Sequence, residues 1–358
     1  MGKKEIKIAT IYISRKIDKF QAVTMDTVRW LRISEALARL GYSVDMITNE
    51  SSQKIIPMAP NLRRVPFKQF DWHDYHVIKT LFQEGFRSLE RVGGSRHPFI
   101  ISKTTVVGSH NMDAIYFYGW HRWRLFQIQK RINKNARYIT LANPLGKKLW
   151  QQEFGKKDNI LIVPSGVDNN IPARRKNPYE HFEGKIVVYI GNIYGPMQRK
   201  VNLQWQHRLN EIGSAIQARG IDLCFIGEGK LDKLDPHAVR YLGPVENEKL
   251  WDYQYFANCG LVLALGEKQN FESSKIYYYL RSGLPVVSES PVPNNNLIKE
   301  AKLGFIAPYN DTVKMIELIE LAVKKKWQKK LAVDYMLKNH TWDQRVQIYD
   351  KIIEKEFS

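Results

Sequence analysis

The chain has 358 residues, of which 44% are hydrophobic and 25% charged. This length predicts two domains of roughly 150–200 residues, and the composition excludes a disordered chain. No run of about 18 apolar residues occurs, so we expect no transmembrane helix. The N-terminus shows neither a signal-peptide apolar region nor the myristoylation pattern. Cys224 and Cys259 lie in apolar stretches, which indicates buried thiols in a reducing cytoplasm.

The net charge of +19 is distributed unevenly along the chain. Residues 1–176 carry 31 Lys or Arg and 14 Asp or Glu, whereas residues 177–358 carry 24 and 22. The first half therefore holds +17 of the excess. This asymmetry favours an anionic partner such as a membrane surface, a lipid-linked substrate or nucleic acid, with a merely soluble basic surface as the alternative. No signature of a nucleic-acid-binding module appears, so nucleic acid is not expected.

The first half opens as a Rossmann-like domain without a dinucleotide fingerprint. The sequence predicts a strand at Ile6–Ser14, a helix from Asp26 or Thr27 to Leu40, and a strand at Ser43–Thr48. Further along the chain, helices are predicted at His73–Arg91 and Asn143–Phe154, and strands at Asp113–Tyr118, Arg137–Ala142 and Ile160–Pro164. Several aromatic residues here lie among cations, which suits either a membrane interface or a small satellite core: Phe70, Trp72, His73, Tyr75 and Phe86.

His121 follows the strand predicted at Asp113–Tyr118. Ligands in open α/β sheets bind beyond the carboxyl ends of the strands, so His121 is a candidate catalytic or acceptor-contacting residue. A structural histidine is the alternative. Asp26 is a second candidate for the catalytic base.

The second half follows a polar linker at Asn169–Gly184 and repeats the alternation of strand and helix. Strands are predicted at Lys185–Ile190, Asp222–Ile226, Val239–Leu242, Gly260–Leu265, Leu284–Ser288 and Phe305–Pro308. Helices are predicted at Leu203–Arg219, Glu248–Phe256, Lys275–Ser282, Thr312–Lys326 and Asp343–Glu356. Thr341 and Gln344 form a capping box before the last helix.

The stretch Glu272–Glu289 contains the clearest candidate for a ligand site. Ser273 and Ser274 are good N-caps, and Gly283 suits the left-handed position that ends a helix. A helix N-terminus with free amides and Lys275 in its first turn suits a diphosphate. An ordinary αβ unit with a solvated lysine is the alternative.

Six segments agree in order and spacing with one family. They are Ile139–Asp168, Val188–Asn192, Phe225–Gly229, Tyr241–Val245, Lys275–Val287 and the Thr341–Trp342 helix start. On these segments the chain resembles the GT-B glycosyltransferases, especially retaining family 4 and its relatives, including bacterial glucuronosyltransferases of exopolysaccharide synthesis.

The resemblance implies an α/β fold of the GT-B type, with two Rossmann-like, doubly wound domains facing a central cleft. Residues 1–170 would bind the acceptor, 171–184 would be the linker, and 185–340 would bind the nucleotide sugar. Residues 341–358 would form a C-terminal helix that crosses back to the first domain.

The resemblance also implies the donor site. Arg199, Lys200, Ser273, Ser274 and Lys275 would hold the diphosphate of the donor. The nucleotide base and cleft would be lined by Gly191, Gly227 and Val245. Neither a metal nor a cofactor is implied beyond the nucleotide sugar, for which a UDP-sugar is expected.

One feature departs from the family pattern. Many members have two glutamates separated by seven residues, and this chain has Asn270 and Tyr278 in that register. Glu272 lies nearby, so we expect Glu272 and Tyr278 to contact the donor sugar or ribose.

The expected activity is that of a hexosyltransferase acting on a lipid-linked or membrane-associated saccharide in polysaccharide or glycolipid assembly. Such an enzyme would be cytoplasmic and peripherally associated with the cytoplasmic membrane face. The alternatives are a catalytically degenerate GT-B protein that serves as a scaffold, and a UDP-sugar epimerase of the same fold.

Overall fold

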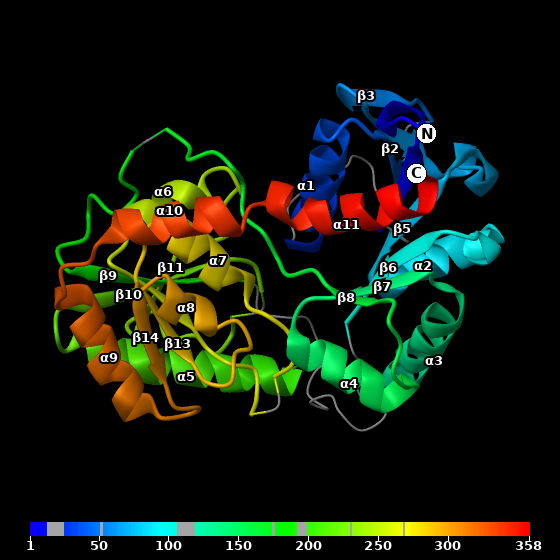
Figure 1. Cartoon of the computed structure of the whole chain (residues 1–358). Coiled ribbons are helices and arrows are strands. Elements are labelled where there is room, and N and C mark those ends of the chain that lie inside the picture. Colours follow the sequence, from blue (N-terminus) through cyan, green and yellow to red (C-terminus); the bar gives the residue numbers. More distant parts are fainter. Residues whose placement is uncertain are drawn as a thin grey trace. The chain divides into compact units, whose positions relative to one another are not determined.

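The computed structural model describes residues 1–12, 25–50, 53–105, 119–173, 176–191, 199–229, 231–267 and 269–358. These residues form two compact α/β units (Figure 1). One unit holds the described chain through Asp168 together with Thr341–Ser358, and the other holds Asn169–His340. The C-terminal segment therefore belongs to the same unit as the N-terminus.

The first unit is built on a sheet in which all described neighbours pair in parallel except β3 and β4. Its strand order is β3-β4-β2-β1-β5-β6-β7-β8. The strands are β1 (Lys7–Ile11), β2 (Ser43–Thr48), β3 (Ile56–Ala59), β4 (Leu62–Pro66), β5 (Val77–Leu81), β6 (Ile100–Lys103), β7 (Tyr138–Leu141) and β8 (Ile160–Ile162). The central strands β1 and β5 are mainly apolar and are buried on both faces, as is typical of parallel strands covered by helices.

The described helices of this unit are α1 (Met25–Arg39), α2 (Phe82–Arg91), α3 (Gly119–Asn135), α4 (Pro144–Phe154) and α11 (Trp342–Phe357). Short 3₁₀ turns occupy Lys3–Glu5, Phe67–Gln69, Trp72–Asp74 and Gly94–Arg96. Helix α11 completes the core, because Trp342, Val346 and Tyr349 are buried in the same cluster as strands β1 and β2. A Cβ on Gly166 would lie 2.8 Å from the Trp342 ring, so this glycine permits the close approach.

The second unit is an all-parallel sheet in the order β11-β10-β9-β12-β13-β14. Its strands are β9 (Lys185–Ile190), β10 (Ile221–Ile226), β11 (Val239–Tyr241), β12 (Cys259–Val262), β13 (Val286–Glu289) and β14 (Gly304–Ala307). Its described helices are α5 (Arg199–Gln217), α6 (Leu250–Phe256), α7 (Ser274–Arg281), α8 (Asn296–Glu300), α9 (Thr312–Lys324) and α10 (Lys329–Asn339).

Several elements differ from the sequence predictions. The helix predicted over His73–Arg91 is wrong in its first half, where Val77–Leu81 is instead strand β5 beside β1. This run is fully buried, and a short apolar run fits either period. Helix α1 begins at Met25, so neither Asp26 nor Thr27 caps it. The sequence pattern also missed β3, β6, α3, α8 and α10. The strand predicted at Asp113–Tyr118 lies outside the described residues.

Other local expectations are confirmed. Gly283 has φ of +71° directly after α7, and Thr341 caps α11 by accepting a hydrogen bond from the amide of Gln344 at 3.3 Å. Cys224 and Cys259 are buried and unpaired, and burial raises the pKa of each thiol to about 12. Among residues 70–86, Phe70, Tyr75 and Phe86 are buried, which agrees with the satellite-core alternative.

Candidate functional site

The second unit has a topological switch point between β9 and β12. The chain leaves β9 toward β10 on one side, and later returns to β12 on the other side. Gly191 follows β9, and α7 begins after β12, so both lie at the carboxyl edge of the sheet beside this switch point. Ligands of open α/β sheets bind at such a place.

Tyr279 fixes helix α7 against strand β9. Its hydroxyl accepts a hydrogen bond from the amide of Ile190 at 2.9 Å and lies 3.4 Å from the carbonyl oxygen of Val188. The buried ring packs against Gly260, where a Cβ would lie only 2.4 Å from the ring. The hydroxyl thus supplies a bond at the end of β9, and the contact holds the helix in a fixed position.

The start of α7 is held by a remote asparagine. The Asn294 side chain accepts from the amide of Ser273 and donates to the carbonyl oxygen of Ser273, both at 2.9 Å. Ser273 occupies the N-cap position, but its hydroxyl makes no capping hydrogen bond, which corrects the expected cap. The first-turn amides of α7 therefore have no hydroxyl cap from Ser273, and Ser274 is the first residue of the helix.

Lys275 lies in the first turn of α7 and reaches back over β9. Its ammonium nitrogen is 4.9 Å from the centre of the buried Tyr189 ring. Burial lowers the pKa of Lys275 to about 8. Among the residues that the structure describes, no carboxylate pairs with it. This half-buried cation at a helix N-terminus is suited to an anion, because both the charge and the helix dipole attract one.

Gly191 provides the space for this lysine. A Cβ at Gly191 would lie 2.8 Å from Cε and 2.9 Å from Nζ of Lys275. The φ of Gly191 is not in the left-handed region, so the glycine is needed for room rather than for backbone conformation. Gly191 and Lys275 are brought together by the fold although they are far apart in sequence.

The other residues predicted to line the nucleotide cleft follow neighbouring strands at the same sheet edge. The amide of Gly191 donates to the carbonyl oxygen of Ile226 at 2.9 Å, and the amide of Gly227 donates to that of Gly243 at 3.1 Å. Gly227 has φ of +151°, which favours glycine. Val245 is partly buried in the loop after β11. These bonds join the three loops into one rim beside α7.

The remaining predicted donor residues divide into two groups. Arg199 and Lys200 begin helix α5, which follows β9, but their side chains lie outside the described part of the structure. Glu272 accepts a hydrogen bond from the Tyr277 hydroxyl at 3.2 Å, so its carboxylate is held close to the start of α7. Tyr278 is partly buried on α7.

The candidate catalytic residues lie in the first unit. Asp26 is in the first turn of α1 and pairs with Arg29 at 3.3 Å. His121 is exposed in the first turn of α3. A third titratable residue, Glu84, lies in the first turn of α2, and the sequence pattern did not indicate it.

Glu84 interacts electrostatically with both candidates. Although much of this residue is exposed, local desolvation raises the pKa of its carboxyl, Asp26 raises it further, and His121 opposes the shift. The Tyr12 hydroxyl, at the end of β1, also bonds to Asp26, and burial raises its pKa. The structure therefore places Asp26, Glu84 and His121 at one edge of the first sheet.

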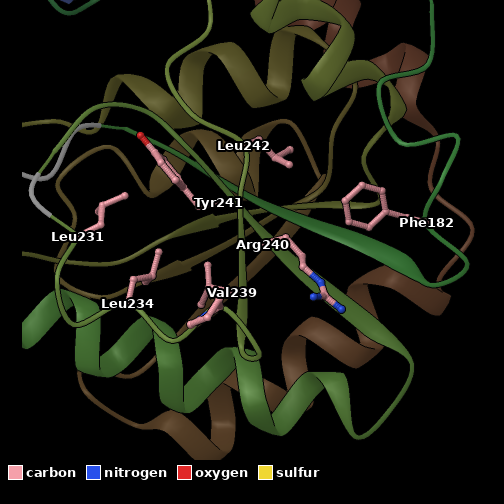
Figure 2. Close-up of a pocket in the computed structure, with 8 residues that line it drawn as sticks. Phe182, Leu231, Leu234, Val239, Arg240, Tyr241 and Leu242 are labelled. Atoms are coloured by element: carbon pink, nitrogen blue, oxygen red, sulfur yellow. The ribbon is translucent and has the colours of Figure 1, made fainter.

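A separate pocket lies around the edge strand β11 and has a volume of about 460 Å³ (Figure 2). It is mainly apolar, and Arg240, its cation, already lies 3.6 Å from Asp222. The lining residues are Phe182, Leu231, Leu234, Pro236, Val239, Arg240, Tyr241 and Leu242. None of these is a predicted site residue, and the lining is poorly suited to a diphosphate. Within the described residues, no group of three or more His, Cys, Asp or Glu could hold a metal.

Comparisons with known proteins identify the fold. Sucrose-phosphate synthase from Thermosynechococcus elongatus matches with a TM-score of 0.75 at 12% identity, over 98% of this chain and 99% of that one. HepE from Anabaena, solved with UDP and glucose, matches with a TM-score of 0.68 at 10% identity, over 98% and 100%. WaaG, a glycosyltransferase involved in lipopolysaccharide biosynthesis, gives 0.60 at 15% identity, over 96% and 95%.

No protein-family profile and no curated protein matches the chain. At these identities the solved structures show the fold alone. The match extends over nearly the whole of each chain, so the predicted α/β fold of the GT-B type is confirmed.

Proposed function

We propose that the protein is a glycosyltransferase that moves a hexose from a nucleotide-diphosphate sugar to an acceptor. The observation that carries this proposal is the half-buried Lys275 at the N-terminus of α7, which has no carboxylate partner in the described residues and a lowered pKa. The donor we propose is a UDP-sugar. In support, three solved structures of this fold contain UDP or UDP-2-fluoro glucose, two of them structures of HepE.

The chemistry follows from the charge on the leaving group. When the glycosidic bond to a nucleoside diphosphate breaks, negative charge develops on the departing phosphate oxygen. The amides of α7 and the ammonium of Lys275 are fixed in place before the reaction, so they stabilise that charge without reorganising. Ser273 and Ser274 would donate hydroxyl hydrogen bonds to the same phosphates, and Arg199 and Lys200 would add charge.

The acceptor would bind to the first unit. His121 and Asp26 are the candidates for the base that takes the acceptor hydroxyl proton, and Glu84 is a third because its pKa is raised toward the working range. The basic first half favours a lipid-linked or membrane-associated saccharide, as in polysaccharide or glycolipid assembly. The proposed location is the cytoplasmic face of the membrane. Within the described part of the chain, every helix is too short or too polar to cross a bilayer.

Thermal unfolding with a panel of nucleoside diphosphates tests the donor assignment. A ligand at a hundredfold excess over its dissociation constant should stabilise the native chain by about 2.7 kcal/mol. We expect this with UDP for the native protein and for Lys299→Ala, an exposed lysine on α8. Lys275→Ala should lose the effect. Stabilisation by no nucleotide, or equal stabilisation of both variants, would refute the assignment.

A catalytically degenerate GT-B protein is the second candidate. It is favoured by one observation, the presence of Asn270 and Tyr278 where relatives often have glutamates. Release of UDP from a panel of UDP-sugars in the presence of a membrane extract distinguishes the two. The transferase proposal predicts release from at least one donor, whereas tight UDP binding without release from any would favour the scaffold.

A further inference from the structure

Helix α3 presents an unusual surface on the first unit. Its seventeen residues include five Lys or Arg and no Asp or Glu. Trp120 is 71% exposed and Trp123 is 51% exposed, and in the described part of the chain no large hydrophobic residue is more exposed than Trp120. Exposing large aromatic surface to water is unfavourable, so two adjacent exposed tryptophans indicate a surface that binds a partner.

The two indole rings form a single platform. Their centres are 4.5 Å apart and their planes are inclined by 22°, so they are stacked. One helical turn further along, the buried face of α3 begins with Leu125, Ile128 and Ile132. At 100° per residue, Trp123, Lys130 and Lys134 lie on the opposite side of the helix, with Trp120 beside them.

The helix is anchored so that this side stays outward. Phe126 stacks on Phe154 of α4 at 5.6 Å, and Arg131 pairs with Glu90 of α2 at 2.6 Å. The Gln129 side chain donates to the carbonyl oxygen of Thr105, just past the end of β6. The tryptophans lie six and nine residues before Gln129, or roughly 9 and 14 Å along the helix axis. The aromatic end therefore projects beyond the strand ends.

The outer face of α3 is defined here as Trp120, Trp123, Lys130 and Lys134. Both lysines are exposed and neither pairs with a carboxylate in the described residues. Tryptophan is favoured at the boundary between headgroups and acyl chains, and lysine is favoured beside anionic headgroups. We propose that the outer face of α3 docks the protein on an anionic lipid bilayer, with the tryptophans inserted at the interface.

This docking surface is independent of the donor site. Its residues all lie in the first unit, whereas Lys275 and Gly191 lie in the second. A variant can therefore lose vesicle binding and retain UDP binding, or lose UDP binding and retain vesicle binding. The docking surface and the donor site are thus tested separately.

Co-sedimentation with vesicles at low salt tests the aromatic part. The full-length protein should bind vesicles of phosphatidylcholine and phosphatidylglycerol, and bind phosphatidylcholine alone much more weakly. Trp120→Ala/Trp123→Ala should weaken binding about tenfold or more through lost apolar burial. The control pair Val313→Ala/Leu331→Ala removes side chains that are 70% and 58% exposed on the second unit, and it should bind as the native protein does.

The electrostatic part is tested with charge variants. Lys130→Gln/Lys134→Gln should weaken binding about fivefold for each charge removed. The control pair Lys249→Gln/Lys330→Gln, with side chains 61% and 86% exposed on the second unit, should have little effect. All these positions are exposed, so the variants should fold, which unfolding curves can check.

Several results would overturn the proposal. They are failure of the native protein to bind anionic vesicles, equal binding to neutral vesicles, or equal weakening by the α3 and control variants. Loss of UDP release with a soluble saccharide acceptor, without any change in vesicle binding, would instead make the tryptophan pair a saccharide-stacking platform and would also overturn the proposal.

Discussion

The substitution Gly191→Ala isolates the contact between the loop after β9 and Lys275. The new Cβ would lie 2.8 Å from Cε and 2.9 Å from Nζ of the lysine, whereas ordinary contacts are about 3.5–4.0 Å. The end of the lysine must therefore move by roughly 0.6–1.2 Å. The φ of Gly191 lies outside the left-handed region, and the clash is with the end of a long side chain rather than with backbone, so the native fold should lose less than about 1 kcal/mol.

The effect on ligand binding should be larger than the effect on stability. A hydrogen bond to a charged group contributes about 1.5–3 kcal/mol. If displacement weakens the bond between Lys275 and a phosphate by that amount, the dissociation constant for UDP rises about 10- to 150-fold. Calorimetric titration of UDP into the native and variant proteins measures this rise directly.

Gly213→Ala is the matched control. Its Cβ would lie 2.2 Å from the carbonyl oxygen of Ala238, so this variant should lose stability through a backbone clash on α5. It leaves Lys275 untouched, and its folded fraction should bind UDP normally. Native affinity in Gly191→Ala would refute the claim that Lys275 holds the diphosphate from its present position.

The remaining predictions concern two lysines and one tyrosine. In the ligand-free protein the pKa of Lys275 is about 8, so UDP affinity should fall as the pH rises above that value. Binding there should be accompanied by proton uptake, which titrations in buffers of different ionisation enthalpy detect. Tyr279→Phe should destabilise the chain by about 1–3 kcal/mol in urea unfolding, because the amide of Ile190 loses its acceptor; an unchanged midpoint would contradict this. Burial lowers the pKa of Lys79 from 10.5 to about 7, so the unfolded state binds more protons between those values and stability should rise with pH across that window. Lys79→Met should remove this rise and add about 1–4 kcal/mol at neutral pH, and a destabilised variant would count against the assignment.

The second unit could be predicted well from the sequence because its signals are local. Strand β9 was placed at its observed bounds, and Gly283 ends α7 with the expected left-handed conformation. The first unit was harder to predict. The mainly apolar run of β5 has no diagnostic period, and α2 follows it in sequence without a polar loop between them.

Features of the candidate site that depend on contacts between residues far apart in sequence could not be predicted without the fold. A diphosphate role for Lys275 followed from the helix start, but the space that Gly191 leaves for it depends on packing. The expected hydroxyl cap was wrong, and the main chain of Ser273 is instead bonded by Asn294, 21 residues away. Glu84 carried no signal in sequence, since only the topology brings α1, α2 and α3 to one sheet edge.

Amide hydrogen exchange with and without UDP tests most directly whether the donor binds at α7. We predict that UDP slows amide exchange at Ser274–Ile276 and at Gly191. Bound phosphate would accept hydrogen bonds from the first-turn amides of α7, and it would order the loop around Gly191. The same experiment on Lys275→Ala should show no such protection at equal UDP concentration. Protection confined to the pocket around β11, or UDP binding without any change at α7, would contradict the account.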